Sequence, residues 1–292
     1  MNRLLDKRCA IITGASRGLG FEIAKKYLEA GASLMICARN EAELHEAALK
    51  LKALAGSGQS VMALPADISK SADVAAIVDR ALRHFGHLDI LVNNAGVAGP
   101  VGTIESVDWD QWLHAIEVNL LGSVLLCRAI LPHFKQAGHG KIVQLSGGGA
   151  TNPLPNLSAY AVSKTAVVRF VETLAEETRP YRIDVNALAP GPLDTRMLDE
   201  FIAAGPERIG AAFFEQSVQH KRAGGFPLNQ GASLAVFLGS SLSDGITGKL
   251  ISAPWDNWRM LPDHLDDLNR TDIFTLRRIV PRDRTLSWGD SD

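Results

Sequence analysis

The chain has 292 residues, of which 46% are hydrophobic and 21% charged, and its formal net charge is −2. This length suits one large α/β domain with its own core, and the nearly balanced charge provides no concentrated basic face for nucleic acid. We expect no apolar run long enough to cross a bilayer, and the N-terminus is too soon charged for a signal peptide.

Short apolar runs alternate with helical patterns along most of the chain. Strands are predicted at 8–13, 33–38, 61–64, 89–92, 141–145, 183–187 and 249–252. Helices are predicted at 19–30, 41–54, 73–85, 109–134, 158–178 and 230–238. The strands are apolar almost throughout, which indicates that helices cover both faces of the sheet. The pattern predicts a doubly wound parallel α/β sheet in a domain of residues 1–253, with a mixed loop and helix segment at 192–228.

The turn between the first strand and the first helix is rich in glycine. Such a turn lets the backbone approach a pyrophosphate at a helix N-terminus, where free N–H groups favour anions. Its spacing is G-x-x-x-G-x-G, and a glycine-rich turn alone is also compatible with an ordinary tight turn. The candidate cofactor-binding residues of this turn are Gly14, Ser16, Arg17, Gly18, Leu19 and Gly20.

Later strand ends support a dinucleotide site. The second strand ends at Arg39, where an acid would be expected for binding a ribose 2′-hydroxyl. Arg39 and Arg17 suit a 2′-phosphate instead, although both are also compatible with solvated surface residues. NADP(H) is therefore favoured over NAD(H). Further candidates follow the third and fourth strands, where ligands of open α/β sheets bind: Asp67, Ile68, Asn93, Ala95 and Gly96.

Tyr160 and Lys164 are four residues apart on a predicted helix, so the phenol and the ammonium share one face. A free phenol has a pKa near 10, and a neighbouring cation would lower it toward the range useful for acid/base catalysis. Such a pair is by itself compatible with an ordinary structural contact. Its position after Ser146, at the end of the fifth strand, favours a catalytic role.

The chain resembles the short-chain dehydrogenase/reductase family over about residues 7–253. The resemblance lies in the identity and order of the glycine turn, Asn93–Gly96, Asn119, Ser146, Tyr160, Lys164 and Pro190–Gly191. The resemblance implies a Rossmann-type sheet of about seven strands. It also implies that Tyr160 exchanges a proton with the substrate oxygen, that Ser146 hydrogen-bonds this oxygen, and that Asn119 anchors a water of the proton relay. Lys164 would hold the nicotinamide ribose and lower the pKa of Tyr160.

The resemblance assigns further cofactor contacts. Gly14, Gly18 and Gly20 would surround the diphosphate, and Asn93 and Gly96 would lie by the adenosine ribose. Contacts on the nicotinamide side would come from Tyr160, Lys164, Pro190, Gly191 and Thr195, with Thr195 on the carboxamide.

The sequence thus predicts hydride transfer between NADP(H) and a small-molecule carbonyl or secondary alcohol. Alternatives are a 3-oxoacyl-thioester reductase, a sugar or polyol reductase, or a non-catalytic NADP(H)-binding sensor or scaffold.

The run Gly147–Gly149 departs from the family pattern and puts the substrate-side geometry in question. The eight histidines show no ligand spacing, so no metal site is expected. The three cysteines stand in apolar stretches, which favours reduced thiols and a cytoplasmic protein.

Residues 254–292 form an extension on which the resemblance gives no guidance. They contain Trp255, Trp258 and Trp288, three of the five tryptophans, and numerous leucines and arginines. Because disordered segments contain few aromatic residues, we expect order here rather than a disordered tail. We expect the extension to stabilise a homo-oligomer, a dimer or tetramer, and to close over a substrate entrance.

Overall fold

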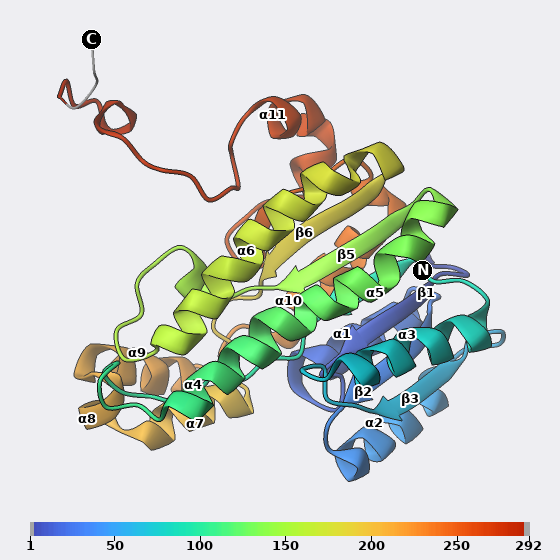
Figure 1. Cartoon of the computed structure of the whole chain (residues 1–292), viewed down its shortest axis with the longest axis horizontal. Helices are drawn as coiled ribbons and strands as arrows, with labels where there is room; N and C mark the ends of the chain where they lie inside the picture. Colours follow the sequence, from blue (N-terminus) through green and yellow to red (C-terminus); the bar gives the residue numbers. More distant parts are fainter. Residues whose placement is uncertain (1–2, 289–292) are drawn as a thin grey trace.

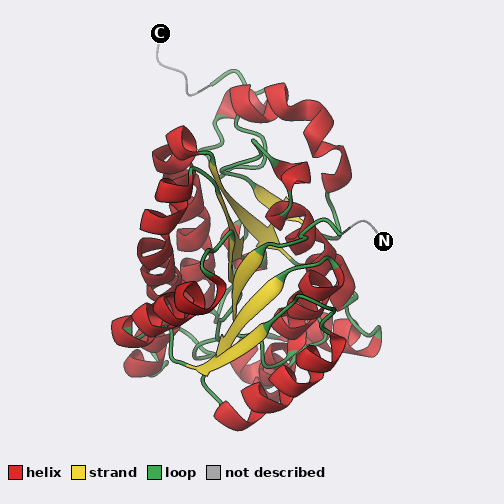
Figure 2. Ribbon diagram, turned by 90° about the vertical axis from the view of Figure 1, so that its right-hand side faces the viewer, coloured by secondary structure: helices red, strands yellow, loops and turns green. Residues whose placement is uncertain are grey.

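The structure is a computed structural model that describes residues 3–288. Seven parallel strands form one sheet in the order β3-β2-β1-β4-β5-β6-β7, and helices cover both of its faces (Figure 2). The predicted doubly wound α/β fold is therefore confirmed. The strands are β1 Cys9–Thr13, β2 Ser33–Ala38, β3 Val61–Pro65, β4 Ile90–Asn93, β5 Gly140–Leu145, β6 Ile183–Ala189 and β7 Leu250–Ser252.

The α-helices connect the strands as expected for crossover connections, and two of them, α2 and α6, have the predicted bounds. Within 192–228 the structure adds three helices, α7 to α9, that the sequence analysis had not delimited. The helices are α1 Gly18–Glu29, α2 Glu41–Leu54, α3 Ser71–Phe85, α4 Trp109–Ile116, α5 Gly122–Ala137, α6 Ser158–Thr178, α7 Arg196–Ala204, α8 Pro206–Ile209, α9 Ala211–Arg222, α10 Leu228–Gly239 and α11 Leu265–Arg270.

The strands after β1 are added first on one side of it, as β2 and β3, and then on the other side, from β4 to β7. β1 pairs with β2 on one side and with β4 on the other, so the connections diverge at this point and leave a crevice at the carboxyl ends of the strands. The strand arrows point toward the end of the molecule that holds α7 to α9 (Figure 1). The crevice and the strand direction together place a ligand site at this end of the sheet.

The two faces of the sheet carry separate apolar cores. One face packs against α1, α2 and α10, with Ile23, Leu44 and Leu234 as fully or almost fully buried members. The other face packs against α3, α5 and α6, through side chains such as Ile77 and Ile130. This arrangement explains why the strands are apolar on both sides.

The predicted helix 109–134 is continuous from Trp109 to Ala137, but a π-helical turn, Glu117–Leu121, separates α4 from α5. By length and hydropathy this stretch could cross a membrane, contrary to our expectation that no such run exists. In the structure its buried side chains, including Leu126, Ile130 and Phe134, belong to the core between the sheet and α3. This packing explains the apolar residues of its buried face.

The C-terminal extension has two parts. Residues 254–276 pack on the domain: Trp258 and Leu268 are buried in the core, and the Leu250 N–H of β7 donates to the Phe274 carbonyl oxygen at 2.8 Å. Residues 277–288, which we call the arm, extend away from the domain beyond α6 (Figure 1). The order expected for the extension is thus clearest in its first part.

Candidate active site

A groove of about 680 Å³ opens at the crevice beside β1, where the sequence predicted a dinucleotide. Gly14 lies at its base with φ +63°, and a Cβ at this position would stand 2.8 Å from the Ala95 Cα, so the backbone approach requires glycine. Twelve of the predicted cofactor residues line this groove: Gly14, Ser16, Arg17, Gly18, Leu19, Gly20, Arg39, Asp67, Ile68, Ala95, Gly96 and Thr195. Its shape and its glycine floor fit a dinucleotide.

Asn93 is placed differently. Its side chain is buried and its Nδ2 donates to the Ser123 carbonyl oxygen at 3.4 Å, inside the core rather than in the groove. The neighbouring Asn94 lines the groove, and its Nδ2 donates to the carbonyl oxygens of Thr13 and Gly14 at 2.9 and 3.1 Å. Asn94 therefore fixes the glycine turn, a role that the sequence analysis did not assign.

Both candidate phosphate-binding arginines line the groove, and each already has a partner. Arg17 Nη1 lies 2.7 Å from the Glu43 carboxylate, and Arg39 Nη1 lies 3.2 Å from His114 Nε2. Glu43 also lines the groove. The sequence analysis missed Glu43 and His114, because both contacts join segments that are far apart in the chain.

Pro190 and Gly191 follow β6 but do not line this groove. Gly191 has φ +80°, and a Cβ there would lie 2.8 Å from Pro254 and 3.2 Å from Phe226. Pro190 faces Gly231 of α10. Their turn is thus held by the start of the C-terminal extension, while Thr195, four residues later, lies in the groove wall.

Tyr160, Lys164 and Ser146 come together where β5 ends and α6 begins. Lys164 Nζ donates to the Leu145 carbonyl oxygen at 3.1 Å and lies 5.7 Å from the centroid of the Tyr160 ring. The buried Ser146 hydroxyl donates to the Lys164 carbonyl oxygen at 3.4 Å. A Cβ on Gly96, in the groove wall, would lie 3.6 Å from Lys164 Nζ, so the catalytic candidates adjoin the cofactor groove.

The first glycine of the unusual run makes room for the Tyr160 hydroxyl. A Cβ on Gly147 would lie 2.5 Å from this oxygen, closer than real Cβ contacts, whereas a Cβ on Gly148 would meet nothing within 4 Å. The third glycine packs against Ala161 of α6. The run thus brings the strand end close to Tyr160 instead of displacing it.

Asn119 lies in the π-helical turn between α4 and α5, a feature often found at functional sites. Its Oδ1 accepts from the Val97 N–H at 2.8 Å, and its Nδ2 donates to the Val97 carbonyl oxygen at 2.9 Å and to the Ser163 hydroxyl at 3.0 Å. The fully buried amide therefore ties the loop after β4 to α6. A Cβ on Gly96 would lie 3.2 Å from Asn119 Oδ1, which places this amide beside the Lys164 ammonium.

The protonation of the pair differs from our expectation. Burial raises the pKa of Tyr160 to about 12 and lowers the pKa of Lys164 to about 8. Burial is the cause of the raised phenol pKa, and the hydrogen bond of the Lys164 ammonium goes to the Leu145 carbonyl oxygen rather than to the phenol oxygen. The phenol is therefore held in its protonated form at neutral pH, the form that can donate a proton to a carbonyl oxygen.

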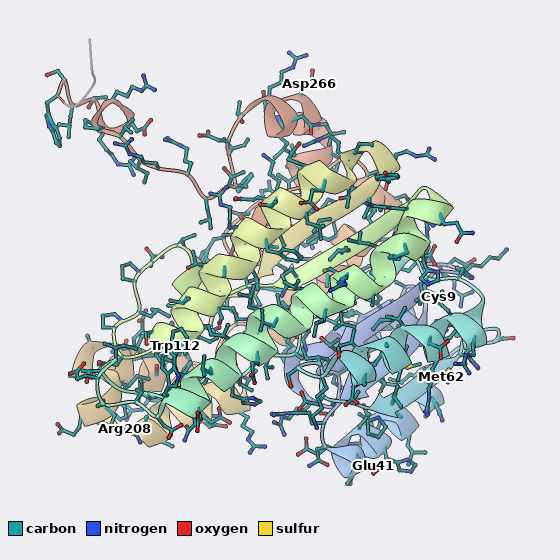
Figure 3. The ribbon with its side chains drawn as sticks, viewed as in Figure 1. Cys9, Glu41, Met62, Trp112, Arg208 and Asp266 are labelled. Carbon is teal, nitrogen blue, oxygen red and sulfur yellow. The ribbon has the colours of Figure 1, made fainter. Side chains whose placement is uncertain are left out.

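One group of possible metal ligands occurs in the described residues, although none was expected. Cys9, His87 and Asp89 place donor atoms within 4.8 Å of one another, at the end of the sheet opposite Arg208 (Figure 3). Asp89 also accepts hydrogen bonds from Arg8 at 2.8 Å and from His139 at 3.0 Å. Burial and the Asp89 charge raise the pKa of the Cys9 thiol to about 12, which disfavours the thiolate that a metal would need.

Comparisons with known proteins agree with the fold. A family model described as short chain dehydrogenase matches residues 8–204. The chain is 33% identical over 250 residues to "Dehydrogenase/reductase SDR family member 4" of Bos taurus, covering 85% of this chain and 86% of that one. 

Two solved structures share the fold over most of their length. A gluconate 5-dehydrogenase from Burkholderia cenocepacia, in complex with NADP and tartrate, is 29% identical with a TM-score of 0.74, covering 86% of this chain and 95% of that one. A levodione reductase is 25% identical with a TM-score of 0.78, covering 89% and 99% respectively. The chain belongs to the short-chain dehydrogenase/reductase family of oxidoreductases.

Proposed function

We propose that this protein transfers a hydride between NADP(H) and a carbonyl/secondary-alcohol pair, and that it works mainly as a reductase. The observation that carries the proposal is the placement of Tyr160 and Lys164 beside Ser146, next to Gly96 of the groove wall. A protonated phenol is the form that the reductive direction requires, because a proton must then be supplied to the substrate oxygen.

Each catalytic candidate has a distinct part in this proposal. The bound cofactor supplies the hydride. Tyr160 donates its proton to the substrate oxygen, and the Ser146 hydroxyl hydrogen-bonds the same oxygen. Lys164 holds the nicotinamide ribose and stabilises the phenolate that forms after proton transfer. Asn119 positions α6 against the loop after β4 and anchors the water that returns a proton.

The preference for NADP(H) over NAD(H) is supported by Arg17 and Arg39, which line the groove. Guanidinium groups match phosphate geometry. The Arg17–Glu43 pair would have to open for Arg17 to reach a 2′-phosphate. Arg39 then provides the contact that distinguishes the two cofactors most directly.

The test of the cofactor assignment compares dissociation constants for NADPH and NADH in the wild type and in Arg39→Asp. A charge-assisted hydrogen bond contributes about 1.5–3 kcal/mol, so NADPH should bind the wild type about tenfold or more tightly than NADH. Arg39→Asp should remove this difference. Equal affinity of the wild type for both cofactors would contradict the assignment.

The test of the acid/base assignment is Tyr160→Phe, which removes the transferable proton and keeps the ring. NADPH binding should persist while turnover falls about a hundredfold or more. Full activity in this variant would show that another group supplies the proton.

We also propose that the protein is a cytoplasmic homo-oligomer, with the arm as the element that reaches a second copy. Ile279, Leu286 and Trp288 of the arm are 57%, 47% and 68% exposed, which leaves apolar surface for a partner to cover. Light scattering on the full chain and on a chain ending at Leu276 tests this assembly. The same number of chains per particle for both would contradict it.

A further inference from the structure

The Tyr160 ring is covered by an apolar cluster at the carboxyl end of the sheet. Four of its members are buried: Ala98, Leu157, Phe201 and Ile209. Tyr160 and Phe213 pack against them. The cluster joins the loop after β4 and the start of α6 to α7, α8 and α9.

Aromatic side chains form a continuous contact from the catalytic phenol into α9. Phe201 of α7 packs edge-on against Tyr160 with 6.2 Å between ring centroids, and Phe213 packs edge-on against Phe201 at 5.7 Å. A substrate whose oxygen accepts the Tyr160 proton must therefore place its neighbouring groups against, or in place of, these rings. Apart from Ser146, which hydrogen-bonds the reacting oxygen, the side chains that pack on the Tyr160 ring in this cluster are hydrocarbon.

Two basic side chains of the same segment form ion pairs within it. Lys221 lies 2.5 Å from Asp194 and 2.9 Å from Asp199, and Arg196 lies 3.4 Å from Glu200. A carboxylate or phosphate on the substrate would have to break these ion pairs to be bound. This arrangement does not favour an anionic substrate.

Two polar side chains at the edge of the cluster donate hydrogen bonds to protein acceptors. Arg208 and Trp112 lie at this end of the molecule (Figure 3). Arg208 donates to the Val101 carbonyl oxygen at 2.8 Å, and the Trp112 indole N–H donates to the Ser158 hydroxyl at 3.1 Å. A polyol bound against the cluster would bury hydroxyl groups without partners, which is unfavourable.

We propose that the substrate is an apolar ketone that carries a cyclic or aromatic hydrocarbon group next to its carbonyl, and that Phe201 and Phe213 determine this specificity. The proposal rests on the proposed function, because it concerns the same reacting oxygen. It selects among the alternatives that the family leaves open, and it disfavours sugars, polyols and carrier-bound thioesters.

The experiment measures kcat/KM with NADPH for three classes of carbonyl compound. Acetophenone and cyclohexanone represent apolar ketones, D-fructose and L-erythrulose represent polyhydroxy ketones, and an acetoacetyl thioester of N-acetylcysteamine represents carrier-bound substrates. We expect the apolar ketones to exceed the polyhydroxy ketones by about a hundredfold, the discrimination typical of a hydrophobic pocket. A higher kcat/KM for a polyhydroxy ketone or for the thioester would overturn the proposal.

Variants test the assigned residues directly. Phe201→Ala should lower kcat/KM for acetophenone about tenfold or more, with little change for D-fructose and with an unchanged dissociation constant for NADPH. Phe201→Leu keeps an apolar side chain and should retain the preference for apolar ketones. Phe85→Ala, on α3 and outside the cluster, is the matched control and should leave the ratio of the two substrates unchanged.

The outcomes separate this inference from the proposed function. If Phe201→Ala lowers kcat/KM equally for every ketone, Phe201 has only a structural role and the specificity assignment is wrong. Should Phe201→Ala fail to fold, Phe213→Ala provides the same comparison from a partly buried position. If the wild type binds NADPH but reduces none of the compounds, the proposed function itself fails, and the inference fails with it.

Discussion

Replacing Gly147 by alanine tests the geometry around Tyr160 with a single methyl group. The new Cβ would lie 2.5 Å from the Tyr160 hydroxyl oxygen and 3.3 Å from Cζ. Since contacts below 3.0 Å essentially never occur for real Cβ atoms, the hydroxyl has to move by about 0.5–1 Å. A misplacement of about 1 Å costs roughly a hundredfold in rate, equivalent to about 2.7 kcal/mol of transition-state stabilisation.

The adjacent glycine provides the control. A Cβ on Gly148 would meet nothing within 4 Å, so Gly148→Ala should keep its activity and gain about 0.4–1 kcal/mol of stability from the less flexible unfolded chain. Both variants are compared by kcat, by the dissociation constant for NADPH and by thermal denaturation. Gly147→Ala should lose turnover while it retains NADPH binding.

Two results would refute this reasoning. Equal kcat values for the two folded variants would mean that the hydroxyl position is not critical or that Tyr160 is not the acid. A loss of NADPH binding in Gly147→Ala would mean that the whole strand end has moved, rather than the phenol alone.

Two further predictions concern protonation and the C-terminal extension. Because burial lowers the pKa of Lys164 to about 8, kcat/KM for NADPH should fall as the pH rises above about 8 and the ammonium is lost, whereas Tyr160, with a pKa of about 12, stays protonated. A profile that is flat to about pH 10 would contradict this assignment. A chain ending at Ser252 should fail to fold, because it lacks Trp258, Leu261 and Leu268, each contributing about 1.5–3 kcal/mol by burial. A chain ending at Leu276 keeps these buried side chains and should still fold, and failure of this chain to fold would show that the domain itself needs the arm.

Secondary structure was predictable wherever a strong hydrophobic periodicity ended at a clear boundary residue, such as a helix cap. Asn40 caps α2 by accepting from the Glu43 N–H at 3.0 Å, and the predicted bounds of this helix are those of the structure. The π-helical turn around Asn119 was not predicted, because an apolar helix pattern does not show where one extra residue is inserted. Helices α7 to α9 are short and separated by Gly205 and Gly210, both at positive φ, so their sequence period is broken before it becomes recognisable.

The site was predictable where motif and strand end coincide, as in the glycine turn that forms the groove floor. It was less predictable where the direction of a side chain decides its role. Asn93 ends β4 facing the core, and Asn94 follows it in the groove. The contacts of Arg39 with His114 and of Arg17 with Glu43 depend on how the elements pack, which local patterns do not contain. The pKa of Tyr160 also depends on packing, since burial rather than charge determines it.

Composition predicted order in the extension but could not separate its two parts, since both contain tryptophan and arginine. They differ in their connection to the sheet edge. The Lys249 ammonium of the chain just before β7 donates to the Ile273 carbonyl oxygen at 3.0 Å, and the Leu276 N–H donates to the Glu172 carboxylate at 2.6 Å. These bonds end at Leu276, and beyond it Trp288 is 68% exposed whereas Trp258 is 7% exposed. The first part is therefore an integral layer of the domain, whereas the arm leaves Trp288 exposed.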